Sequence, residues 1–174
     1  MLKNRNLPKI VKEKTGSAIL IFQFQHIRRL LGTLDHLVYS STSPHLVEIS
    51  PGHFEEKGDF KNNGSFIQRM ASRFCIPYLF CSTLMSKFYS KPNEEQIALA
   101  ARLIDSIEKM YREQFAVESF KIFWLGSDDD MRVFRKFSKI QMIRSTYDKL
   151  DDGHPSAKGA QEIVNFLFTQ KIIY

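Results

Sequence analysis

Ala18-Ile19-Leu20-Ile21-Phe22 is a short, uninterrupted apolar stretch rich in β-forming residues. Such a stretch is typical of a strand buried on both faces of a parallel sheet, because a strand with one solvated face alternates apolar and polar residues. Four further stretches of similar length predict strands at 45–49, 76–81, 120–125 and 140–143. The chain is therefore expected to form a five-stranded, mainly parallel sheet.

Helical patterns separate the predicted strands. Apolar residues recur at spacings of three and four, which places them on one face of a helix. The expected helices cover 27–38, 66–74, 93–115 and 157–168, and the polar segment 55–65 is expected to be a loop. Strands that alternate with helices indicate a three-layer α/β/α sandwich of the flavodoxin-like kind.

Two helix starts carry clear capping signals. Asn93, followed three residues later by Gln96, matches the capping box, and Ser156 is the expected N-cap of the last helix. The acidic stretch Gly126-Ser127-Asp128-Asp129-Asp130 is interpreted as a solvated turn and helix start rather than as a nucleophile or metal loop.

Length and composition favour one globular domain. A chain of 174 residues with 43% apolar content and 15 phenylalanines can bury one core. No apolar stretch approaches the roughly 20 residues that a membrane span requires. The two cysteines, Cys75 and Cys81, are too few for a disulfide framework, and the N-terminus matches neither a secretory signal nor a transit peptide. A cytoplasmic protein is expected.

The positive charge is concentrated at the N-terminus. Residues 1–14 carry five basic side chains against Glu13, so they account for four of the six net positive charges. We therefore expect a basic arm over 1–16 and a single α/β domain over 17–174. Such an arm can bind a polyanion, although a solvated tail is the more frequent outcome.

Ligands of open parallel sheets bind beyond the carboxyl ends of the strands. Gln25 and His26 follow the first predicted strand, and Ser82 follows the third. These three residues are candidates for lining a cleft. The histidines show no zinc-ligand spacing, and neither a metal nor a cofactor is expected.

The segment Asp151-Asp152-Gly153-His154-Pro155-Ser156 lies between the last predicted strand and the last helix. A carboxylate three residues before an imidazole can accept its Nδ1 hydrogen, fix the tautomer and leave Nε2 as a base for a hydroxyl. A plain tight turn that leads into a capped helix is the alternative interpretation.

This segment resembles the final Asp-x-x-His block of the SGNH (GDSL-type) hydrolases, with Asp151 and His154 at the matching spacing. The resemblance covers about the last quarter of the chain, together with a compatible order of strands and helices. It implies an acyl or acetyl ester hydrolase in which His154 is the general base and Asp151 orients it. It also implies an oxyanion glycine after the second strand, and Gly52 is the candidate.

The chain departs from the family at the nucleophile. SGNH hydrolases carry Gly-Asp-Ser after the first strand, where this chain has Gln23-Phe24-Gln25, and an amide cannot form an acyl intermediate. The family's Gly-x-Asn-Asp block has no counterpart after the third predicted strand. In an alternative alignment to the family, His45–Gly52 would correspond to its third strand, but the family's first strand would then have no counterpart in this chain. If a nucleophile exists, the residues to consider are Cys81, Ser50 and Ser82.

Two functions therefore remain open. One is an SGNH-type ester hydrolase, impaired because its serine is missing. The other is a non-catalytic SGNH-like module that binds RNA or a protein partner. An RNA surface would use basic residues interleaved with Phe134 and Phe137, although an exposed face over core aromatics is the simpler interpretation. The basic candidates are Arg132, Arg135, Lys136 and Lys139.

Overall fold

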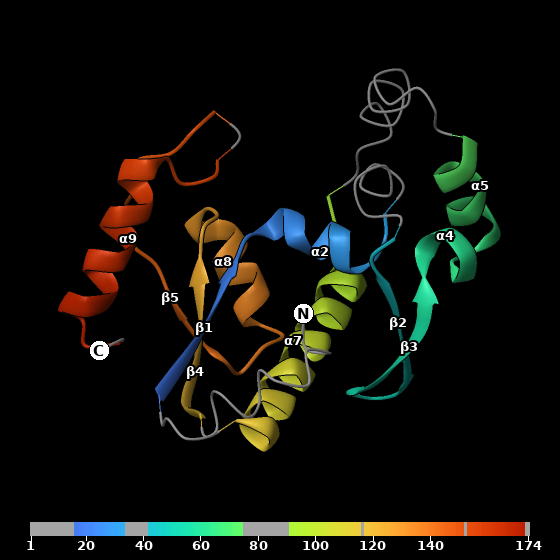
Figure 1. The fold of residues 1–174 in the computed structure, drawn as a ribbon, viewed down its shortest axis with the longest axis horizontal. Helices are drawn as coiled ribbons and strands as arrows, with labels where there is room; N and C mark the ends of the chain where they lie inside the picture. The colour runs from blue at the N-terminus through green and yellow to red at the C-terminus, as the bar shows by residue number, and fades with distance from the viewer. Residues whose placement is uncertain (1–15, 34–41, 75–90, 116, 152, 173–174) are drawn as a thin grey trace. The chain divides into compact units, whose positions relative to one another are not determined.

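The computed structural model describes residues 16–33, 42–74, 91–115, 117–151 and 153–172. These residues form a mixed α/β structure (Figure 1). The strands are β1 (Gly16–Phe22), β2 (Pro44–Ser50), β3 (His53–Asp59), β4 (Val117–Trp124) and β5 (Gln141–Ile143). The helices are α2 (Phe24–Leu30), α4 (Phe60–Asn63), α5 (Phe66–Phe74), α7 (Glu94–Gln114), α8 (Asp128–Arg135) and α9 (Ala157–Thr169).

The chain divides into two compact units. The first unit combines Met1–Gln23 with Ile107–Tyr174, and the second comprises Phe24–Ser106. The boundary falls within α7, between Ser106 and Ile107. In the described part of the chain, no helix has both the length and the apolar character needed to cross a membrane.

The first unit contains a three-stranded parallel sheet in the order β1-β4-β5. Phe22 lies level with Trp124, and Phe123 lies level with Ile143, so the three strands end close to one row. The ladder extends one residue further, because the Leu125 amide donates to the Phe22 carbonyl at 2.8 Å. The predicted strands at 18–22, 120–125 and 140–143 are thus confirmed.

The two faces of this sheet pack against different helices. On one face, the Phe134 ring of α8 lies 5.5 Å from the rings of Phe22 and Trp124. On the other face, Phe123 and Leu125 join a buried cluster with α9 residues. Successive strand residues point to opposite faces, which gives each helix its own row of apolar partners. The α9 members of the cluster are Ile163, Leu167 and Phe166.

The prediction of a five-stranded sheet is wrong. Segment 45–49 is a strand, but β2 pairs antiparallel with β3 in a separate two-stranded sheet within the second unit. Ser50 pairs with His53, so Pro51 and Gly52 form the intervening turn. Gly52 has a φ of +75°, a left-handed conformation that glycine adopts without steric cost. The predicted strand at 76–81 lies outside the described residues.

Segment 55–65 was expected to be a loop, and this prediction is also wrong. Its first part belongs to β3 and its middle to α4, where the Asp59 side chain caps the helix by accepting from the Asn62 amide. β3 is mostly exposed and polar, so it lacks the apolar content that marks a buried strand.

Both capping predictions are confirmed. Asn93 and Gln96 exchange reciprocal side chain to backbone hydrogen bonds of 2.8 and 3.0 Å ahead of α7. The Ser156 hydroxyl accepts from the Gly159 amide at the start of α9. The helix at 66–74 is confirmed as α5, whereas the predicted helix at 27–38 is described only as the shorter α2 and its following turn.

One ion pair ties the hairpin of the second unit to α7. Arg102 donates from Nε and Nη2 to the two carboxylate oxygens of Glu48, both at 2.7 Å. The Gly52 amide donates to the same carboxylate at 2.8 Å. The hydrogen bond from Arg102, followed by the Gly52 amide, lowers the pKa of Glu48 against the opposing effect of burial. This pair joins the hairpin turn to the helix.

We expect Glu48→Gln to lower the free energy of unfolding by about 1 kcal/mol near neutral pH, since Arg102 is 40% exposed and solvent screens the pair. A group with a lowered folded pKa stabilises above its unfolded pKa, about 4.3 for glutamate, and loses this contribution as the pH falls through the folded pKa. Urea unfolding at pH 7 and at acidic pH tests this. Equal destabilisation by the substitution at both pH values would contradict it.

Candidate functional site

The carboxyl ends of β1, β4 and β5 meet at one edge of the sheet, and each strand delivers a polar segment there. Gln23 follows β1, Ser127 and Asp128 follow β4, and Arg144 and Ser145 follow β5. Gln23 is buried, with 4% of its surface exposed. This edge is where ligands of open parallel sheets bind.

The segment between β5 and α9 closes on itself as a narrow loop. Lys149 and Pro155 form an isolated antiparallel bridge, and the Leu150 amide donates to the His154 carbonyl at 2.8 Å. Gly153, with a φ of +85°, makes the turn possible. His154 thus stands on a braced loop rather than on an extended connection.

The backbone of Asp148 holds this loop against the start of α9. Its carbonyl accepts from the Ser156 amide at 3.1 Å, and its amide donates to the Glu162 carboxylate at 2.7 Å. The Ser156 hydroxyl, which caps α9, also donates to the Asp148 carboxylate. Gly159 lies so close that an added Cβ would stand 1.7 Å from the Asp148 carbonyl oxygen. Only glycine fits at this contact.

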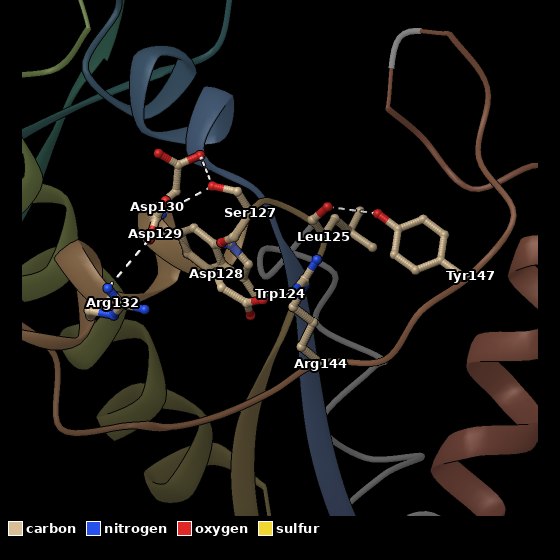
Figure 2. A network of polar contacts seen from close by, with 9 residues as sticks. All are labelled: Trp124, Leu125, Ser127, Asp128, Asp129, Asp130, Arg132, Arg144 and Tyr147. Atoms are coloured by element: carbon tan, nitrogen blue, oxygen red, sulfur yellow. Dashed lines mark hydrogen bonds and ion pairs between the residues drawn. The ribbon is translucent and has the colours of Figure 1, made fainter.

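Tyr147 ties the same loop to the end of β4. Its hydroxyl donates to the Leu125 carbonyl at 2.7 Å (Figure 2). The same hydroxyl lies 3.5 Å from the Gly153 carbonyl. Burial raises the pKa of Tyr147, while the nearby Arg144 charge acts in the opposite direction. The phenol therefore stays protonated and remains a donor across the physiological pH range.

These contacts bring His154 to the end of β1. Its Nε2 lies 3.4 Å from Nε2 of Gln23, across 131 residues of sequence. A carboxamide nitrogen only donates, so this contact is a hydrogen bond when the lone pair of the imidazole is on Nε2. The ring nitrogen that a serine hydrolase uses as its base therefore faces an amide.

The resemblance implies that a carboxylate, Asp151, orients His154. Asp151 is exposed in the turn, and Asp152 lies outside the described residues. Asp151 and His154 are both described, and the buried His154 Nδ1 forms no hydrogen bond with Asp151, so the predicted contact between this carboxylate and Nδ1 is wrong.

Sequence reasoning did not select Ser145. It lies between Ile143 and Tyr147, which both pack against the α9 cluster. Its hydroxyl is buried and has no hydrogen-bond partner among the residues that the structure describes. The only sequence signal was its position after a predicted strand. The adjacent Arg144 forms an ion pair with Asp128 of α8.

The acidic stretch after β4 is a helix start, as the sequence indicated. Ser127 is the N-cap of α8, accepting from the Asp130 amide at 3.1 Å and donating to the Asp130 carboxylate at 2.8 Å (Figure 2). The Trp124 indole donates to the Ser127 carbonyl at 3.0 Å. The three aspartates lie in the first turn of α8, where negative charge is stabilising.

The RNA-binding candidates lie on α8 and in the segment after it. Arg132 pairs with Asp129 at 3.4 Å, and Arg135 donates to the Met142 carbonyl at 3.0 Å. Phe134 is fully buried and unable to stack on a base. Lys136 and Lys139 are exposed. The face is thus a set of basic side chains over a core aromatic.

The remaining predicted site residues belong to the second unit or are not described. Gln25 and His26 are half-buried in the first turn of α2. Gly52 is exposed in the hairpin turn, with its amide committed to Glu48. Its assignment as an oxyanion glycine rested on a second parallel strand, and that strand is antiparallel. Ser82 and Cys81 lie outside the described residues.

Among the described ranges, no three His, Cys, Asp or Glu side chains lie close enough together to hold a metal ion. Comparison of the chain with protein-family models, curated proteins and solved structures gave no match.

We expect Gly159→Ala to lower the free energy of unfolding by at least about 2 kcal/mol, although alanine is normally the better helix former. The added methyl group has to displace the Asp148 backbone, which is not a flexible side-chain end. Urea denaturation measures the effect, and Lys158→Ala, at an exposed position one residue earlier, is the control. A neutral or stabilising Gly159→Ala would contradict the close approach.

We expect Gln23→Leu, which keeps the side-chain size but removes the amide donor, to shift the ¹⁵N resonance of His154 Nε2. Long-range ¹H–¹⁵N correlation spectra of the histidine rings measure this shift. The control is Gln141→Leu at the amino end of β5, level with Ile19 of β1, which should leave the His154 signals in place. An unchanged His154 signal in Gln23→Leu would contradict the contact.

Proposed function

We propose that this chain is an SGNH-like α/β domain that binds a small ligand carrying ester or hydroxyl oxygens, and that it does not hydrolyse esters. The ligand would bind at the carboxyl edge of the β1-β4-β5 sheet. The observation that carries the proposal is the 3.4 Å approach of the Gln23 amide to His154 Nε2.

The polar groups at this edge support binding. The amide of Gln23 and the imidazole of His154, which lie 3.4 Å apart, can together donate to and accept from ester and hydroxyl oxygens. The buried hydroxyl of Ser145 follows β5 at the same edge of the sheet. Neither Gln23 nor Ser145 carries a charge, and Arg144, the cation that follows β5 at this edge, is paired with Asp128. A neutral polar ligand therefore suits this edge best.

The same contact argues against catalysis. A serine hydrolase needs its imidazole lone pair directed at a hydroxyl, and here the lone pair meets an amide donor. Removing the nucleophile from a dissected serine protease lowers kcat on the order of 10⁶-fold. Without a serine partner, His154 would have no acyl-serine route to accelerate.

We expect the protein to show no turnover of p-nitrophenyl acetate above the buffer rate, and His154→Ala to behave identically. Release of p-nitrophenolate measures this. Turnover that disappears in His154→Ala would contradict the proposal and reveal a nucleophile, with Ser145→Ala, Ser50→Ala, Ser82→Ala and Cys81→Ala as the variants to compare.

Ligand binding, the other part of the proposal, can be measured separately. Titration with ethyl acetate should shift the amide signals of Gln23, Leu125 and His154 in ¹H–¹⁵N spectra, and Gln23→Leu should reduce these shifts. Gln141→Leu is the matched control. Shifts scattered over the whole chain, or none at these residues, would contradict ligand binding at this edge.

A further inference from the structure

Helix α5 presents its apolar side chains to solvent. Phe66 is 68% exposed, Ile67 62% and Met70 41%. Residues three and four positions apart share a helix face, so Phe66 and Met70 stand together with Ile67 beside them. Exposed apolar residues that gather on one face indicate an interaction surface, whereas scattered ones do not.

The polar side of the same helix faces its own unit. The Gln68 amide nitrogen donates to the Gly32 carbonyl at 2.9 Å, and its oxygen accepts from the Ser65 amide at 2.7 Å. Ser72, one turn later, is half-buried and donates to the Gln68 carbonyl. The hydrogen bond from Gln68 to Gly32 directs this side of α5 toward its own unit, whereas Phe66, Ile67 and Met70 are exposed. An ordinary surface helix turns its apolar face to the core and its polar face to solvent, and α5 does the opposite.

The charged residues within α4 and α5 are all positive. Residues 60–74 contain Lys61, Arg69 and Arg73 and no acidic residue. Arg69 and Arg73 are exposed, one turn apart, and form no ion pair with any described residue. α4 and α5 lie side by side within the second unit (Figure 1). A cationic rim thus borders the apolar side chains.

We propose that α5 docks the protein on an anionic membrane surface. Phe66, Ile67 and Met70 would enter the boundary between headgroups and acyl chains, and Arg69 and Arg73 would contact the lipid phosphates and carboxylates. A second copy fits this face poorly, because the arginines of two opposed helices would repel. RNA also fits poorly, since Ile67 and Met70 offer no ring on which a base can stack.

The test is co-sedimentation of the full chain with vesicles. The protein should bind vesicles of phosphatidylcholine mixed with phosphatidylserine and bind pure phosphatidylcholine far more weakly. Phe66→Ser with Ile67→Ser should weaken binding at least roughly ten-fold. Arg69→Gln with Arg73→Gln should weaken it roughly five-fold per charge, and added salt should mimic this loss.

Matched controls separate α5 from general hydrophobicity and charge. Phe168→Ser removes a 51% exposed phenylalanine from α9, and Lys136→Gln with Lys139→Gln removes two exposed charges. Neither should weaken binding as much as the α5 variants, and circular dichroism should show every variant folded. Binding that survives the α5 changes, as attraction through the basic arm alone would, overturns the proposal. So does no binding, or Phe66-dependent self-association without vesicles.

Discussion

The contact between Gly159 and the Asp148 backbone is the constraint on which the position of His154 depends. α9 is anchored to the sheet by Ile163 and Leu167, so its first turn is fixed by the core. Asp148 then bonds to that turn through its amide, carbonyl and carboxylate. A larger residue at position 159 would separate helix and loop, because protein interiors do not absorb a misplaced methyl group without backbone movement. Core packing therefore sets where the imidazole stands.

The chemistry at the sheet edge follows from which atom that imidazole meets. Tyr147 ties the loop to the Leu125 carbonyl, and β1 runs beside β4, so His154 reaches the end of β1. In a hydrolase this arrangement would give the base a hydroxyl. The amide nitrogen of Gln23 instead faces Nε2 of the imidazole, where it can donate to the ring lone pair. The loop thus holds a histidine suited to hydrogen bonding rather than to proton abstraction.

Sequence patterns identified the elements whose signals are local. The caps at Asn93 and Ser156 and the three strands of the first unit were predicted from the sequence, because capping and continuous apolar runs depend on neighbouring residues. The pairing of β2 was not, since an apolar strand does not specify its partner and the polar β3 resembles a loop. The hydrogen bond between Asp148 and Glu162 depends on how closely α9 approaches the segment before it. The spacing of apolar residues in the sequence does not predict that distance. The single domain over 17–174 stays a prediction.

In the proposed function, the identity of residue 23 is only part of the reason that hydrolysis is not expected. A serine hydroxyl sits much closer to the backbone than a glutamine amide does, and the amide already lies 3.4 Å from His154 Nε2. A serine at position 23 would therefore leave a gap too long for proton transfer unless the loop moved toward β1. That movement is opposed by the Asp148 contacts with α9 and by the Tyr147 hydrogen bond. Acyl transfer at this edge would need a nucleophile whose backbone approaches His154 more closely than β1 does, so both the residue and the geometry favour binding.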